Sequence, residues 1–150
     1  MRKFQFRFET VERVRREKER EAMRALAGAQ ARLRAAHERK TALIRELEAS
    51  LDRRERLGSE PVGIEPFLIE DAYIEGTKVR MLQSDHLIER ARKDLARKID
   101  EYLKARRRTK VMEKLREREL RIHRKERAKA ERKELDDVYV MRARFRGEPA

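Results

Sequence analysis

Apolar residues recur every seven positions through the second half of the chain. Their series is Phe67, Ile74, Met81, Ile88, Leu95, Tyr102 and Thr109. This is the period of a coiled-coil seam, in which one stripe of a helix faces a partner helix. The pattern predicts a long amphipathic helix in this part of the chain.

The first half of the chain carries the same period in smaller residues. One series is Ala22, Ala29, Ala36, Leu43, Ser50 and Leu57, and a second is Leu26, Leu33, Lys40, Leu47 and Arg54. The strongest helix-breaking stretch between the two halves is LGSEPVGIEP, in which Gly58 can end one helix and Pro66 can begin another. Thr10 is a fair N-cap, although the spacing of Phe4, Phe8 and Val11 extends the pattern further back. We therefore expect a single elongated coiled-coil domain over residues 1–150, with helices at about 4–57 and 66–142, a turn at 58–65 and a frayed tail at 143–150.

Folding the chain back at this turn makes an antiparallel pair in which opposed residue numbers sum to about 124. Leu57 then meets Phe67, and Ser50, Leu43, Ala36, Ala29 and Ala22 meet Ile74, Met81, Ile88, Leu95 and Tyr102. In the second series, Leu47 meets Thr77, Leu33 meets Ala91 and Arg54 meets Glu70. Small residues thus face large ones, which allows two helices to fill one seam. The sequence predicts an all-α hairpin of two long helices, and the alternative is a dimer of long helices.

The second predicted helix is longer than the first and overhangs it. In this register Met1 reaches only His123, so residues 124–142 extend beyond the first helix. Phe8 and Phe4 fall opposite Arg116 and Leu120, where their rings would close the base of the hairpin.

Composition supports an elongated helical protein. Charged residues make up 47% of the chain and aromatic residues 5%, so a compact globule has little to bury. The chain has no cysteine, and no apolar run approaches the roughly 18 residues of a membrane span. These features favour a cytoplasmic protein.

The net charge of +13 is unevenly distributed. Residues 1–60 carry +6, residues 61–100 carry −1 and residues 101–150 carry +8. An antiparallel hairpin brings the two basic segments to one end, and a basic balance raises affinity for nucleic acid, anionic lipid and acidic protein surfaces alike.

The sequence shows no arrangement typical of an enzyme. His37, His86 and His123 are isolated from other metal-ligand residues, and no glycine-rich phosphate loop occurs. We expect no catalytic residues, no metal and no cofactor.

The N-terminal stretch KFQFRFETVERVRREKEREAMRALAGAQ resembles the opening of the flagellar export protein FliJ family. The family pattern of Phe-x-Phe-x-Leu, then Val and Arg, then Glu-x-x-Ala with Ala and Leu falls on Phe4, Phe6, Phe8, Val11, Arg13, Glu21, Ala22, Leu26 and Ala29. Phe8 stands where the family more often has Leu, and Glu12 stands at a position that is often apolar. The segment Lys133 to Asp137 also resembles the family's charged C-terminal helix.

This resemblance implies an antiparallel coiled coil similar to the central stalk subunit of rotary ATPases, acting in type III export. It implies contacts with the hexameric export ATPase, with the membrane export-gate protein and with export chaperones, at the cytoplasmic face of the inner membrane. We expect the basic end of the hairpin to bind the ATPase. The residues expected to make this contact are Phe4, Phe8, Arg13, Arg15, Arg16, Lys18, Arg20, Arg116, Arg124, Lys125 and Arg127. We expect the other end of the hairpin to bind the export gate, through Leu43, Ile44, Leu47, Tyr73, Ile74 and Met81.

Two other functions fit a basic helical hairpin. One is binding of nucleic acid through phosphates, although acidic side chains are mixed through every basic run and dilute the field that a phosphate backbone needs. The other is a structural spacer, for which the charged overhang serves only solubility.

Overall fold

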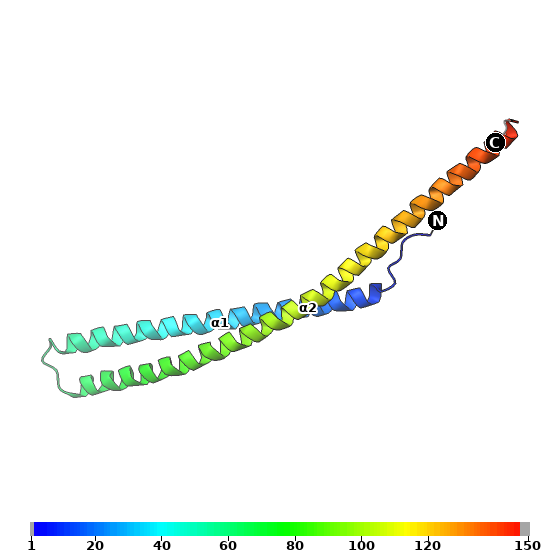
Figure 1. Cartoon of the computed structure of the whole chain (residues 1–150). Helices are drawn as coiled ribbons and strands as arrows, with labels where there is room; N and C mark the ends of the chain where they lie inside the picture. Colours follow the sequence, from blue (N-terminus) through cyan, green and yellow to red (C-terminus); the bar gives the residue numbers. More distant parts are fainter. Residues whose placement is uncertain (1, 148–150) are drawn as a thin grey trace. The chain divides into compact units, whose positions relative to one another are not determined.

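The computed structural model describes residues 2–147 of the chain and contains two long helices (Figure 1). Helix α1 runs over Glu9–Leu57 and helix α2 over Glu65–Phe145, with 49 and 81 residues. The described part of the chain contains no strand. The predicted all-α fold with a longer second helix is confirmed.

The chain divides into two compact units. The hairpin unit is formed by Arg20–Leu103 and contains the turn. The terminal unit is formed by Met1–Glu19 and Lys104–Ala150. Each unit contains a stretch of α1 and a stretch of α2.

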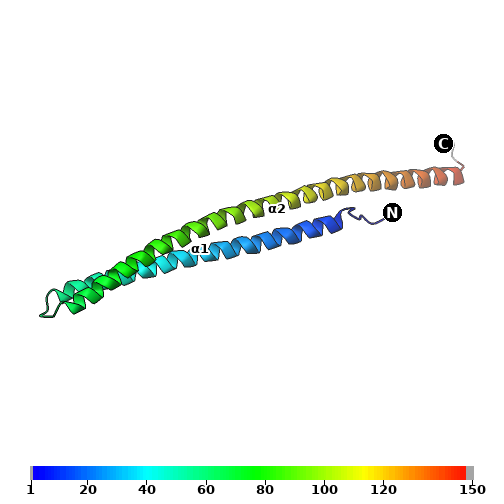
Figure 2. The same ribbon diagram turned by 90° about the horizontal axis from the view of Figure 1, so that it is seen from below.

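In the hairpin unit α1 and α2 lie side by side and run antiparallel (Figures 1 and 2). Every residue of the predicted first seam series between 22 and 102 is buried or half-buried. The ion pairs across the unit join residues whose numbers sum to 123–126: Arg32–Asp94, Lys40–Asp85, Glu46–Arg80, Arg53–Glu70 and Arg54–Asp71. The predicted register near 124 and the intramolecular pairing are therefore confirmed.

One predicted pair is exchanged within this register. Arg54 was expected to meet Glu70, but it pairs with Asp71, and Arg53 pairs with Glu70 at 2.9 Å. Both arginines thus find a carboxylate on α2, one residue along from the predicted pairing.

The seam of the hairpin unit is narrow and partly polar. Ser50 and Thr77 are fully buried, with 0% exposure. Thr77 donates a hydrogen bond from Oγ1 to the carbonyl of Tyr73 at 2.8 Å, so its hydroxyl is satisfied within its own helix. Small hydroxyl residues let the two helices approach closely where the opposite side chain is large.

The turn begins and ends where the sequence indicates. After Leu57, the N–H of Gly58 donates to the carbonyl of Glu55 at 3.1 Å, and the Ser59 hydroxyl donates to the carbonyl of Arg56 at 2.8 Å. These bonds satisfy carbonyls that the helix end leaves without a helical partner. Helix α2 then starts at Glu65 with Pro66 in its first turn, where a missing N–H costs nothing.

The N-terminal segment of the terminal unit differs from the prediction. Helix α1 starts at Glu9, not near residue 4, and residues 2–6 form no helix. An extended chain advances about 3.3 Å per residue against 1.5 Å in a helix, so the segment reaches further along α2. Phe4 accordingly lies against His123, with ring centroids 5.5 Å apart, instead of opposite Leu120.

Beyond His123, helix α2 continues as predicted for the overhang. Residues 124–147 are exposed except for the half-buried Ala130 and Ala143. The helix ends at Phe145, three residues later than expected, and the predicted tail at 148–150 lies outside the described residues.

Candidate partner-binding surfaces

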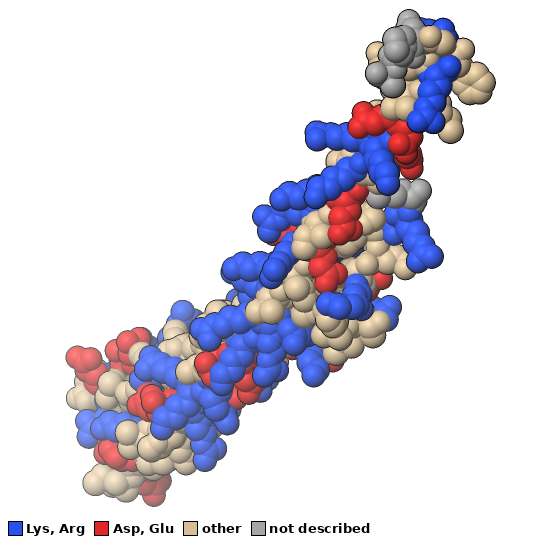
Figure 3. Space-filling model, turned by 45° about the vertical axis from the view of Figure 1, so that its right-hand side comes forward, with Lys and Arg blue, Asp and Glu red and all other residues tan. Residues whose placement is uncertain are grey.

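Nearly all of the net charge belongs to the terminal unit. That unit contains 25 basic and 13 acidic residues, a net charge of +12, whereas the hairpin unit contains 17 and 16, a net charge of +1. Figure 3 shows on one face that Lys and Arg side chains alternate with Asp and Glu side chains rather than forming a pure basic stripe. The excess positive charge of the chain is thus concentrated in the terminal unit.

An acidic side chain is buried in the seam of this basic unit. Glu12 is 2% exposed, and Arg116 Nη1 of α2 lies 3.2 Å from its Oε2 atom. Arg16, one turn further along α1, also contacts the Glu12 carboxylate. Two guanidinium groups therefore compensate the charge that burial would otherwise disfavour.

The aromatic residues of the N-terminal segment cover the same seam. Phe6, which is 5% exposed, lies beneath the Arg116 guanidinium at 5.9 Å and packs edge-on against Phe8 with centroids 6.0 Å apart. The prediction placed Phe8 opposite Arg116, and this is wrong because the non-helical backbone turns Phe6 inward. Phe4 and Phe8 are half-buried.

The predicted ATPase-binding cations fall into two groups. Arg16 and Arg116 hold Glu12, Arg15 donates to the carbonyl of Arg108 at 3.2 Å, and Arg127 pairs with Glu131 at 2.9 Å. Arg20 belongs to the hairpin unit and has an interaction partner of its own. The remaining cations are exposed and form no ion pair or hydrogen bond with any residue that the structure describes: Arg13, Lys18, Arg124 and Lys125.

The predicted gate-binding residues lie in the hairpin unit, but most of them face the seam. Leu43 and Ile74 are buried, and Leu47 and Met81 are half-buried. Ile44 and Tyr73 are exposed, and the Tyr73 hydroxyl donates to Glu46 at 3.1 Å. Tyr73 also lies between two guanidinium groups, those of Arg53 and Arg80, at 5.9 and 5.6 Å from its ring centroid.

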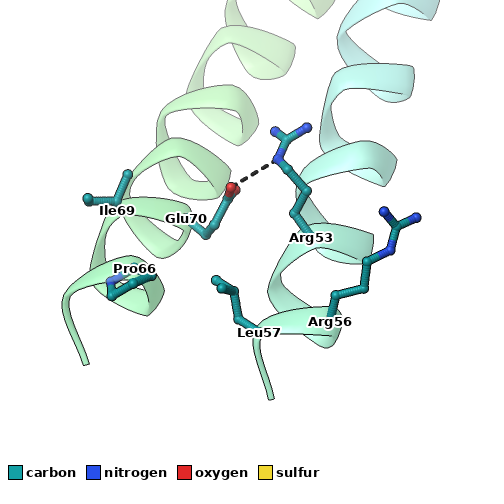
Figure 4. A pocket seen from close by; sticks show the side chains of 6 residues that line it. All are labelled: Arg53, Arg56, Leu57, Pro66, Ile69 and Glu70. Carbon is teal, nitrogen blue, oxygen red and sulfur yellow. Dashed lines mark hydrogen bonds and ion pairs between the residues drawn. The ribbon is translucent and has the colours of Figure 1, made fainter. Parts of the chain in front are cut away.

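A shallow pocket of about 330 Å³ opens at the turn (Figure 4). Leu57, Pro66 and Ile69 form its apolar part, and Arg53 and Glu70 bridge the two helices on one side. Ile64 and Ile69 are 71% and 70% exposed. The heptad pattern does not predict this surface, because Ile64 and Ile69 stand outside the series; apolar residues out of phase beside a turn are the signal that indicates it.

Comparison with known families decides the family of the chain. The model of the flagellar FliJ protein matches residues 4–148. The chain belongs to the FliJ family. No curated protein and no solved structure matches it. The expected family membership is confirmed over nearly the whole length.

FliJ-family proteins are components of the flagellar export apparatus, so this chain functions within that machinery. The family is one of export components rather than of known enzymes. Within the described residues no helix is long and apolar enough to cross a membrane, and no cluster of potential ligands could hold a metal ion.

Two carboxylates of this FliJ-family chain have lowered pKa values, and both bridge the helices of the hairpin unit. The hydrogen bond from Arg54 holds the pKa of Asp71 below its usual value. Arg32 does the same to the pKa of Asp94, through a hydrogen bond of 3.1 Å and with help from the charges of Arg97 and Lys98. These ion pairs join the exposed edges of the two helices, and they stabilise the pairing of α1 and α2 rather than form a reactive site.

Proposed function

We propose that this protein is a stalk of the flagellar type III export apparatus. Its terminal unit inserts into the ring of the export ATPase, and its hairpin unit contacts the membrane export-gate protein and escorts export chaperones. The protein then works at the cytoplasmic face of the inner membrane through these partners. The supporting observation is the concentration of +12 of the +13 net charge in one unit of a FliJ-family chain.

The free cations of the terminal unit are the contact residues of this proposal. A ring lined with acidic loops would attract the unit at long range, and rim charges govern the rate of association more than its final affinity. Arg13, Lys18, Arg124 and Lys125 are free to meet carboxylates of the ring. Arg116 acts indirectly, because it joins α2 to the Glu12 carboxylate of α1, and Arg16 contacts the same carboxylate from within α1.

The hairpin unit suits a different kind of contact. Its charges nearly cancel, and three of its most exposed apolar residues lie at or beside the turn, namely Ile64, Leu68 and Ile69. Exposed apolar side chains in an otherwise charged protein mark interaction surfaces. The gate contact is therefore assigned to the turn region and to the exposed Ile44 and Tyr73.

Binding to the purified export ATPase at increasing salt concentration tests the ATPase contact. We expect the double variant Arg13→Glu/Lys18→Glu to lose association, and the wild type to lose it progressively as salt rises. The matched control is Arg34→Glu/Arg45→Glu, which changes the net charge equally at exposed positions of the hairpin unit. Equal loss of association in both variants would show that only the net charge of the protein matters. Absence of association between the wild type and the ATPase at low salt would refute the stalk proposal.

Nucleic acid is the second candidate partner, because the terminal unit is strongly basic. Retention of the wild type on duplex DNA with a steep salt dependence would favour it. The 13 acidic residues interspersed in the terminal unit argue for an acidic protein surface instead.

A further inference from the structure

We propose that a groove on the hairpin unit, lined by residues between Arg39 and Glu46 of α1 and between Arg80 and Leu87 of α2, is a binding site for an acidic side chain of a protein partner. The groove has a volume of about 330 Å³ and lies between α1 and α2. Its lining includes Arg39, Leu43, Glu46, Arg80, Ser84 and Leu87. This inference stands apart from the question of which unit meets the ATPase.

The groove contains a buried hydroxyl without a hydrogen-bond partner. Ser84 is 3% exposed, and its Oγ atom has no partner within the described part of the chain. Thr77, one heptad earlier on the same stripe of α2, satisfies its hydroxyl on the carbonyl of Tyr73 at 2.8 Å. An unsatisfied buried polar group costs free energy, so Ser84 gains from an incoming acceptor that rotation about its χ1 bond would bring within reach.

The groove also contains one cation without a counter-ion. Arg39 is exposed and forms no hydrogen bond or ion pair with a described residue. Arg80, in contrast, donates to Thr77 Oγ1 at 3.1 Å and pairs with Glu46 at 3.5 Å. Glu46 is occupied further by the Tyr73 hydroxyl at 3.1 Å. The charge left unmatched in the groove is therefore the positive charge of Arg39.

These two groups together define the chemistry of the ligand. A carboxylate can accept from the Arg39 guanidinium and from the Ser84 hydroxyl at the same time. The groove favours a singly charged group over a phosphate, because the Glu46 carboxylate lies on its wall. The volume is near the lower end for ligand sites, which suits one amino-acid side chain rather than a cofactor.

The apolar part of the lining points to a protein as the source of this carboxylate. Leu43 forms part of the floor with 8% exposure, and Leu87 forms part of the wall with 44% exposure. A partner helix with a glutamate flanked by leucines one turn away would place the carboxylate on Arg39 and an aliphatic side chain on Leu87.

Titration of the full-length, isotope-labelled protein followed by NMR tests the proposal. The probe is a synthetic helical peptide with one glutamate flanked by leucines, and the control peptide has glutamine instead. We expect the glutamate peptide to shift the amide signals of Ala42, Ser84 and Leu87, and the glutamine peptide to bind about tenfold or more weakly, since a charge-assisted hydrogen bond is lost. Arg39→Gln should weaken binding of the glutamate peptide to the same extent.

Matched variants separate the groove from general electrostatics. Arg34→Gln removes another exposed, unpaired arginine of α1 outside the groove and should leave binding unchanged. Ser84→Ala should weaken binding by a smaller factor, with unfolding measured in parallel to show that the hairpin persists. Equal binding of the two peptides, equal loss in Arg34→Gln and Arg39→Gln, or no shift at Ser84 and Leu87 would each overturn the proposal. The same amide shifts on addition of inorganic phosphate would show that the groove binds a free anion, and would also overturn the proposal.

Discussion

Arg116 on α2 lies 3.2 Å from the carboxylate of Glu12 on α1, and Glu12 is buried to 2% exposure. An acidic residue thus occupies the seam of the most basic part of the chain. The Arg116 guanidinium also lies 5.9 Å from the centre of the Phe6 ring, so one side chain connects α2 to both α1 and the N-terminal segment.

Removal of Arg116 should therefore destabilise the protein. We expect Arg116→Ala to lower the free energy of unfolding by about 1–3 kcal/mol, because Glu12 keeps only Arg16 as its partner and the Phe6 ring loses its cover. Glu12→Leu should be neutral or stabilising, since an apolar residue suits a seam position and leaves no charge buried. Urea denaturation of the single and double variants measures both effects. If the change in unfolding free energy of the double variant equals the sum of the two single changes, the two side chains are not coupled.

The N-terminal segment should detach when Phe6 is truncated. We expect Phe6→Ala to speed hydrogen exchange and protease cleavage in residues 2–8, because this buried ring anchors a segment that has no helix of its own. Phe145→Ala is the control, since Phe145 is 91% exposed. Equal protection of the segment in Phe6→Ala and in the wild type would contradict the anchoring role.

The hairpin unit should lose stability in acid through Asp71 and Asp94. Their folded-state pKa values are lowered, so each contributes stability that is complete above its unfolded pKa of about 3.9 and is lost as the pH falls through the folded value. Asp94→Asn should flatten the decline of the unfolding temperature below about pH 4. Arg32→Gln should have the same effect, because it removes the hydrogen bond that lowers the Asp94 pKa. If the unfolding temperature of these variants declines as steeply with falling pH as that of the wild type, the Arg32–Asp94 pair does not contribute to stability.

Substitution of Gly76 should stabilise α2. Gly76 lies within the helix, and a Cβ atom added there meets nothing within 4 Å. Gly76→Ala should raise the free energy of unfolding by about 0.5–1 kcal/mol, because alanine loses less conformational freedom than glycine in a helix. Thermal unfolding followed by circular dichroism measures it. A decrease would indicate that the backbone at Gly76 must depart from regular helical geometry.

The sequence was sufficient for the hairpin but not for the candidate surfaces. The heptad series predicted the seam of the hairpin unit and its register, because most of its large residues on one helix can face a small residue on the other. The partners of Arg53 and Arg54 could not be predicted in the same way. Two adjacent arginines have side chains of equal length, and local geometry determines which carboxylate each of them pairs with. The groove at Arg39 and Ser84 was equally invisible, because it depends on which side chains remain without a partner after all other pairs have formed.

The sequence by itself determined the two helices, the turn between them and their antiparallel pairing, because these follow from a repeated spacing and from one glycine and proline stretch. Only the tertiary structure decided that residues 2–6 leave the helix, that Phe6 rather than Phe8 lies against Arg116, and that Glu12 is buried. The physical reason is that the seven-residue spacing determines which way a side chain faces only while the backbone is helical. Once the backbone is extended, or a charged side chain must find a counter-ion, the position is set by contacts with residues more than a hundred places away in the sequence.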